Sequence, residues 1–470
     1  MFKAFFTNSF GILSSRVLGF IRDMLQASII GANIYTDIFI VAFKLPNLFR
    51  RIFAEGAFTQ SFLPQFIKTR NKGFFATAIL KKFLIFLIFF SVVVTLFSNF
   101  FTKIIATGFS QEIIDLASPL VAINFYYLIL IFLVTFLASL LQYKNHFATS
   151  AFAPALLNIS LIFAMLYSKD LSKYQMIYNL SIAVIVGGVM QVVVHIIAIK
   201  KYHLDKLLIA SFISKKRKTK KLLTDIKEFK NKFFASTLGT STAQISAFLD
   251  GWLASFLVSG SISYLYYANR IFQFPLALFG IAISTAIFPK VAKYINNEDE
   301  KKAKVLLKNS FWFLMAILSI STLTGIIFSK EIVWLLYERG DFKAIDTQNT
   351  SIILSMYLIG LLPFGISKIF SLWLYSKHRQ KDAAKISVIS LTFNIVLSIL
   401  LISTLKAAGL ALASSLSGFI LFFLTIKAYG FDEFKKIALS KNLIYLIIFL
   451  AILSASFIWL KEIIDIKFHI

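Results

Sequence analysis

Long apolar blocks separated by short polar ones run along the whole chain of 470 residues. One block, FLIFLIFFSVVVTLFSNFF at 83–101, holds 19 residues without a charged side chain. About 20 such residues in a helix cross a hydrocarbon core of about 30 Å. The pattern predicts thirteen membrane-spanning helices, near residues 6–30, 34–53, 83–102, 115–142, 150–168, 177–199, 234–258, 263–289, 309–328, 350–375, 386–404, 407–426 and 442–460. The fold class is therefore an all-α polytopic membrane protein.

Composition supports this fold class and removes several kinds of chemistry. Hydrophobic residues make up 58% of the chain and charged residues only 15%, against about 25% charged in soluble domains. The absence of cysteine excludes disulfides, thiolate metal sites and cysteine nucleophiles. No glycine-rich phosphate loop, paired-histidine zinc motif or metal-binding acidic cluster is present, so we do not expect an enzyme.

The net charge of +27 is distributed unevenly between the predicted loops. With the N-terminus in the cytoplasm, the cytoplasmic side holds 35 of the 49 lysines and arginines, the outer side 9, and the spans 5. Cytoplasmic loops carry such an excess, so we predict a cytoplasmic N-terminus and read the basic charge as a topology feature. Membrane lipids are then the expected partners of these residues, and nucleic acid is not.

The densest basic run, SKKRKTKKLLTDIKEFKNK at 214–232, predicts a division of the chain into two halves. We expect an N-lobe at 1–200 with helices 1–6 and a basic cytoplasmic linker at 201–233. A C-lobe at 234–430 with helices 7–12 follows, and then an extra C-terminal helix, the thirteenth, at 431–470. Each half contains a matching proline in its second span, Pro46 and Pro275, followed by a similar Phe-rich turn, as in duplicated transporters.

The stretch SSRVLGFIRD, residues 14–23, places Arg16, Arg22 and Asp23 inside the first span. Each such charge costs roughly 2.5–3.5 kcal/mol at a helix centre and therefore needs a reason. Internal salt bridges that lock the helices together are one reason, and Asp37 and Lys44 in the second span are spaced for one. The other is a water-accessible cavity that receives an anion. Basic residues outnumber acidic ones in the spans, which favours an anion, and the arginine fork suits phosphate.

These blocks resemble the bacterial lipid II flippase family (MurJ, also called MviN), a relative of the multidrug and toxic-compound extruders (MATE). The resemblance rests on SRVLGFIRD, TDIFIVAFKLPNLFRRIFAEGAFTQSFLPQF, YYANRIFQFPLALFGIAISTAIFP and LLYERGDF, and it runs from about residue 6 to residue 430. It implies a MATE-like two-lobe bundle without cofactors. Such a protein moves lipid II, the undecaprenyl-diphosphate-linked muropeptide, from the cytoplasmic to the outer leaflet of the plasma (cell inner) membrane by alternating access.

The same resemblance assigns expected roles to residues. Arg22 and Arg270 are expected to hold the diphosphate in a cationic central cavity, with Asp23 as their counter-charge. The substrate-binding positions are Ser15, Arg16, Arg22, Asp23, Ser263 and Arg270, and the gate positions are Asp37, Arg50 and Glu55.

A Na⁺ site reported in some relatives corresponds to Asp250, Asn394, Ser398 and Ser414. Ser398 stands where an aspartate can occur, which removes one charge from the site. An ordinary hydrogen bond between helices is the alternative role for Asn394 and Ser398.

Members of this family commonly have fourteen helices, the last two of which hold the lipid tail. Because the pattern predicts only thirteen spans, we expect this chain to lack the fourteenth helix and to end outside the cell.

Two other functions stay open. A multidrug or other polyprenyl-diphosphate-oligosaccharide exporter of the same fold would differ in its resistance profile or its cargo. A scaffold of the cell-wall synthesis machinery, which is also an expected partner, would tolerate loss of the cavity charges.

Overall fold

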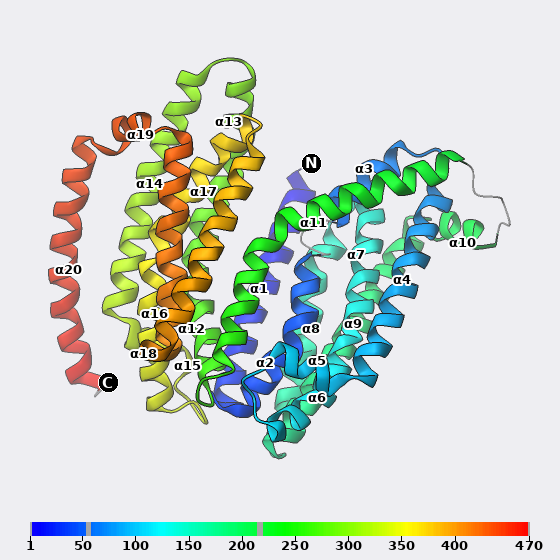
Figure 1. Cartoon of the computed structure of the whole chain (residues 1–470), viewed down its shortest axis with the longest axis horizontal. Helices are drawn as coiled ribbons and strands as arrows, with labels where there is room; N and C mark the ends of the chain where they lie inside the picture. Colours follow the sequence, from blue (N-terminus) through cyan, green and yellow to red (C-terminus); the bar gives the residue numbers. More distant parts are fainter. Residues whose placement is uncertain (1, 53–57, 214–219, 469–470) are drawn as a thin grey trace. The chain divides into compact units, whose positions relative to one another are not determined.

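The computed structural model describes residues 2–52, 58–213 and 220–468, which are nearly all helical and include no strand. The chain forms two compact units, Met1–Phe248 and Leu249–Ile470 (Figure 1). The first unit contains α1 (Phe2–Ile30), α2 (Ile34–Ile52), α3 (Phe58–Lys68), α4 (Lys72–Leu96), α5 (Ser98–Ile105), α6 (Gln111–Phe125), α7 (Tyr127–Tyr143), α8 (Ala148–Tyr167), α9 (Lys173–Lys201), α10 (Asp205–Ile213) and most of α11 (Lys220–Ala254).

The second unit begins within α11 and is also helical. They are α12 (Ser261–Pro275), the π-helix η2 (Leu276–Ile281), α13 (Ala282–Asn296), α14 (Glu300–Ile327), α15 (Ser329–Tyr337), α16 (Ala344–Ile359), α17 (Leu361–Ser376), α18 (Gln380–Tyr429), α19 (Phe431–Ala438) and α20 (Lys441–Phe468). The two units share one irregularity. A single residue, Tyr126 in the first unit and Gly360 in the second, interrupts a long helical span.

Helices account for all thirteen predicted spans. Among the described residues, nine continuous helical segments are long and apolar enough to cross a membrane. One of them, α18, has 50 residues, but its backbone breaks at Lys406 (φ 50°, ψ −131°), where the sequence predicts a loop between two spans. The other predicted spans, α1, α2 and α11, contain charged residues such as Arg22, Lys44 and Asp250, which lower their hydropathy. The prediction of an all-α polytopic protein is confirmed.

The largest error in the predicted boundaries concerns α4. The sequence predicts a span from residue 83, but the helix begins at Lys72 and ends at Leu96. Lys81 and Lys82 are exposed residues within the helix. Lysine keeps its alkyl stem on apolar surface and its ammonium group in water, so these two residues do not interrupt the helix.

The first part of α11 packs against the first unit by an apolar face. Leu222, Ile226, Phe229 and Phe233 are buried at helical spacing, and Lys227 on another face is exposed. The rings of Phe229 and Phe233 lie 5.7 Å and 6.2 Å from the Phe58 ring of α3. Residues 220–233, within the stretch predicted as a basic linker, therefore form a packed amphipathic helix (Figure 1).

A buried carboxylate adds polar contacts to this packing. Asp225, 6% exposed, accepts hydrogen bonds from Gln65 Nε2 at 3.1 Å and from Thr69 Oγ1 at 2.7 Å. Both donors lie on or directly after α3, so Asp225 attaches α11 to the segment that follows α2.

In the second unit, α20 packs along α14 at the edge of the helix bundle (Figure 1). Phe457 contacts Phe328, with ring centres 5.4 Å apart. Lys461 forms an ion pair with Glu331 at 2.7 Å and donates to the carbonyl of Ile327 at 2.9 Å. These contacts attach the thirteenth helix to the end of α14 and the start of α15.

Candidate functional site

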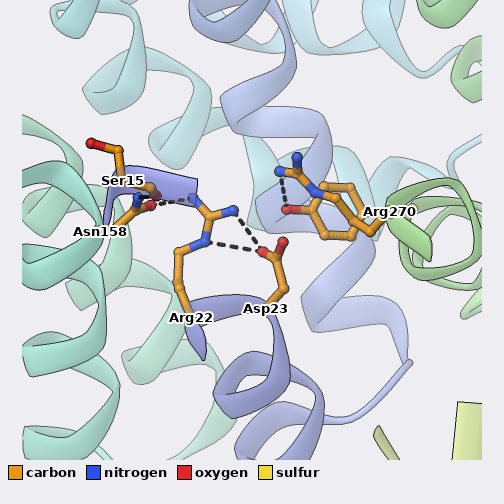
Figure 2. Close-up of polar contacts among 6 residues, drawn as sticks. Ser15, Arg22, Asp23, Asn158 and Arg270 are labelled. Atoms are coloured by element: carbon orange, nitrogen blue, oxygen red, sulfur yellow. Dashed lines mark hydrogen bonds and ion pairs between the residues drawn. The ribbon is translucent and has the colours of Figure 1, made fainter. Parts of the chain in front are cut away.

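Arg22 and Asp23 of the first span form a hydrogen-bonded cluster with α8 (Figure 2). Arg22 Nε and Nη2 both donate to Asp23 Oδ1, at 3.0 Å and 2.6 Å, and Nη1 donates to Asn158 Oδ1 at 3.0 Å. Asn158 Nδ2 donates in turn to the carbonyl of Ser15 at 3.0 Å. The Ser15 hydroxyl donates to the carbonyl of Ala151 at 3.2 Å. The guanidinium is thus held from two sides before any ligand arrives.

Small residues on α1 make this arrangement possible. Gly11, Ser15 and Gly19 recur every four residues and so lie along one side of the helix. A Cβ added at Gly11 would come within 2.9 Å of Ala151, and one at Gly19 within 3.4 Å of Asn158 Nδ2. The close approach of α1 and α8 brings Asn158 within reach of the Arg22 guanidinium.

Burial distinguishes the charged residues of this span. The side chain of Asp23 is 2% exposed and that of Arg22 is 12% exposed. Arg16 is exposed and points about 120° away from Arg22 around the helix. A buried carboxylate that orients a partly accessible guanidinium is an arrangement that receives an anion at low reorganisation cost. Arg16, which is exposed on another side of α1, is not part of this arrangement.

The predicted gate residues Asp37 and Arg50, and Lys44 between them, lie in different surroundings along α2. Asp37 is buried at 2% exposure near the start of the helix. Lys44 donates to the carbonyl of Phe248 at 2.8 Å, and its ammonium group lies 5.1 Å from the centre of the Phe248 ring. Arg50 Nε donates to Asn47 Oδ1 at 3.0 Å. Glu55 lies outside the described residues.

In the second unit, α12 carries the predicted Ser263 and Arg270. Arg270 Nη2 donates to the hydroxyl of Tyr266 at 2.9 Å, and its guanidinium carbon lies 4.9 Å from the centre of that ring (Figure 2). Ser263 is fully buried. Pro275 ends α12, and the π-helix η2 follows directly, a distortion frequent at functional sites.

The residues predicted for Na⁺ supply oxygen atoms only. The Ser398 hydroxyl donates to Asn394 Oδ1 at 3.2 Å, and both side chains are buried, one turn apart on α18. This bond joins two residues of one helix. The alternative role expected for Asn394 and Ser398 is a bond between helices, so this bond is of a different kind. Ser414, on the other part of α18, and Asp250, on α11, are half-buried.

Two residues of these clusters are absent from the predictions made on sequence. Asn158 is a polar residue within an otherwise apolar span, and this contrast could have identified it. Tyr266 precedes Arg270 by four residues, which places both on one face of a helix.

Comparison with known proteins gives concordant matches along the chain. The family model described as "Lipid II flippase MurJ" matches residues 26–469. A protein of Helicobacter pylori named "Probable lipid II flippase MurJ" is 49% identical over 435 residues, which cover 91% of this chain and 94% of that protein. A protein of the same name from Buchnera aphidicola subsp. Baizongia pistaciae is 34% identical, covering 89% of this chain and 82% of its own length.

Solved structures give the same result. A structure titled "Lipid II flippase MurJ, inward closed conformation" matches with a TM-score of 0.79 and 25% identity, covering 98% of both chains. An inward-facing multidrug resistance MATE transporter matches with a TM-score of 0.64 at 12% identity, covering 89% of this chain and 94% of its own. The second likeness concerns the fold alone, and it confirms the expected MATE-like architecture.

Proposed function

The chain belongs to the lipid II flippase (MurJ) family, and we propose that it moves lipid II from the cytoplasmic to the outer leaflet of the bacterial inner membrane. The observation that carries the proposal is the 49% identity to a probable lipid II flippase over 91% of the chain. The nine helical segments that are long and apolar enough to cross a membrane, counted among the described residues, suit a multi-pass transporter of an amphiphile. Transport of this kind makes and breaks no covalent bond.

The chemistry of the Arg22 cluster supports a diphosphate as the bound group. Arginine binds phosphate through paired, charge-assisted hydrogen bonds, which are stronger than neutral ones. Asp23 and Asn158 fix the plane of the Arg22 guanidinium, and Tyr266 does the same for Arg270. We propose that each of these arginines binds the diphosphate in the course of transport by alternating access. The Ser15 hydroxyl, which donates to the carbonyl of Ala151, supports the packing of α1 on α8.

The test is rescue of a strain whose own lipid II flippase is depleted. We expect this chain to restore growth and cell shape, because its cargo is the precursor that such cells fail to export. A drug exporter of the same fold would instead raise resistance to cationic drugs and leave the depleted strain unrescued. That outcome would remove lipid II as the cargo.

A coupling cation is a further part of the proposal. Asp250, Asn394, Ser398 and Ser414 offer a carboxylate, an amide oxygen and hydroxyl groups, and hard cations prefer such oxygen ligands. Asp250 would supply the one negative charge of the set. The Ser398 hydroxyl already donates to Asn394 Oδ1, so cation binding would require this hydroxyl to turn.

Sodium coupling predicts a dependence of flipping on the cation present. In vesicles containing the purified protein, replacing Na⁺ with choline at constant ionic strength should slow lipid II flipping, and Asp250→Asn should remove the difference. Asp432→Asn, at an exposed position of the same unit, is the control. Equal rates in Na⁺ and choline for the unmodified chain would exclude Na⁺ as the coupling ion.

A further inference from the structure

Arg270 lies at one end of a series of aromatic contacts that leads into the buried part of the second unit. Its guanidinium donates to the Tyr266 hydroxyl at 2.9 Å and lies 4.9 Å from the centre of that ring. The Tyr266 ring meets the ring of its neighbour Tyr267 edge-on, with centres 5.5 Å apart and planes at 76°. Tyr266 and Arg270 are both half-buried, whereas Tyr267 is fully buried. The arginine therefore rests on a ring that packs against a buried one.

Tyr267 is held by two aromatic residues from another segment of the same unit. Its ring centre lies 4.9 Å from that of Tyr337, at the end of α15, and 5.6 Å from that of Phe342, in the turn before α16. The Tyr337 and Phe342 rings are 5.8 Å apart, so the three rings contact one another. All three side chains are at most 1% exposed. Rings packed this densely have few alternative rotamers, so Tyr267 has a fixed position beside Tyr266.

A buried carboxylate attaches the turn that carries Phe342 to α12. The Tyr264 hydroxyl, one turn before Tyr267, donates to Asp346 Oδ1 at 2.8 Å. Asp346 Oδ2 accepts a hydrogen bond from the backbone N–H of Lys343, the residue after Phe342, at 2.8 Å. Asp346 is 7% exposed. The aromatic cluster of Tyr267, Tyr337 and Phe342 is thus fixed from both of the segments that form it.

An arginine that binds a ligand gains from being held in place beforehand. Its long side chain has many rotamers, and ordering them on binding costs affinity. Tyr266 orients the Arg270 guanidinium through a hydroxyl and a ring face, both of which are neutral. A neutral partner orients the guanidinium without cancelling its positive charge, as a carboxylate would. The position of the Tyr266 ring therefore matters for the strength with which Arg270 binds an anion.

From these contacts we propose that Tyr267 is a positioning residue for Arg270. Together with Tyr337 and Phe342, it holds the Tyr266 ring where that ring receives the guanidinium. Tyr267 acts through Tyr266 and does not touch the ligand. Its effect on ligand affinity rests on the proposed function, in which Arg270 binds the diphosphate, whereas its effect on the guanidinium itself does not.

Phenylglyoxal, which modifies accessible arginines, tests the positioning without any substrate. The measured quantity is the modification rate of Arg270 in the purified protein, followed by mass spectrometry, relative to that of the exposed Arg379. Tyr267→Leu keeps an apolar side chain but removes the ring, and it should raise this ratio by about threefold to tenfold, because the guanidinium is released from Tyr266. Phe342→Leu loosens the same cluster from the turn and should have the same effect.

Two further variants show whether Tyr267 acts through the Tyr266 hydroxyl. Tyr266→Phe removes only that hydroxyl and should raise the ratio by itself, and adding Tyr267→Leu should then raise it no further. Phe311→Leu removes a ring from a separate buried cluster, where Phe311 contacts Phe370 and Phe434, and should leave the ratio unchanged. An unchanged ratio in Tyr267→Leu, an equal rise in Phe311→Leu, or additive effects with Tyr266→Phe would overturn the proposal.

The affinity for lipid II in nanodiscs distinguishes a positioning role from a merely structural one. We expect Tyr267→Leu to weaken binding by about threefold to tenfold, and to have almost no effect when Arg270→Ala is also present. Equal weakening with and without Arg270 would assign Tyr267 a structural role only and overturn the positioning. If Arg270→Ala left the affinity unchanged while Tyr267→Leu still raised the modification ratio, the proposed diphosphate contact would fail and the positioning of Arg270 would stand.

Discussion

Arg22→Ala is expected to abolish rescue of flippase-depleted cells, although the protein still inserts into the membrane. The substitution removes a guanidinium that makes three hydrogen bonds to Asp23 and Asn158 and that we place on the diphosphate. Each charge-assisted bond to phosphate contributes about 1.5–3 kcal/mol, so the loss of two slows flipping by 100-fold or more. Growth, together with the amount of protein in isolated membranes, measures the effect.

Two variants separate the charge of Arg22 from its geometry. Arg22→Lys keeps the positive charge but lacks the planar fork, so we expect partial rescue. Arg70→Ala removes an exposed arginine in the turn before α4 and should rescue fully. Full growth of cells carrying both Arg22→Ala and Arg270→Ala would contradict the assigned role of these arginines.

Asp225→Ala is expected to destabilise the first unit by about 2–4 kcal/mol. The substitution leaves Gln65 Nε2 and Thr69 Oγ1 buried without the carboxylate that accepts their hydrogen bonds. Each buried donor that loses its acceptor costs about 1–3 kcal/mol. The free energy of unfolding in mixed detergent micelles containing SDS measures the change.

Glu228→Ala is the matched control on the same helix. Glu228 lies 3.4 Å from Lys68, and these two side chains are 38% and 66% exposed. An exposed pair of this kind contributes at most about 1 kcal/mol. If Asp225→Ala were no more destabilising than Glu228→Ala, the hydrogen bonds of Asp225 to Gln65 and Thr69 would contribute nothing measurable to the free energy of unfolding.

Most of the spans were predictable from sequence because their hydropathy specifies them. A helix in a bilayer needs about 20 apolar residues. The sequence contains two such stretches within α18, and the break at Lys406 lies between them. The start of α4 was not predictable in this way, because Lys81 and Lys82 lie inside the helix. The lysines of residues 220–233 led to the prediction of a basic linker. The buried apolar face from Leu222 to Phe233 instead packs these residues as a helix on the first unit.

The candidate site was partly predictable for a related reason. A charge inside a span is rare and costly, so Arg22, Asp23 and Arg270 are evident in the sequence. Their partners depend on which helices meet, and one sequence does not contain that information. Asn158 is 136 residues from Arg22, and only the packing of α1 on α8 brings them together.

Accessibility of lipid II in the outer leaflet, measured after acute loss of this protein, tests the central claim most directly. Intact cells would be treated with an enzyme that cleaves only lipid II exposed on the outside, and the cleaved fraction would be counted. The proposed function predicts that this fraction falls soon after the protein is lost, while lipid II accumulates inside. An unchanged exposed fraction in cells without the protein, and without another flippase, would contradict it.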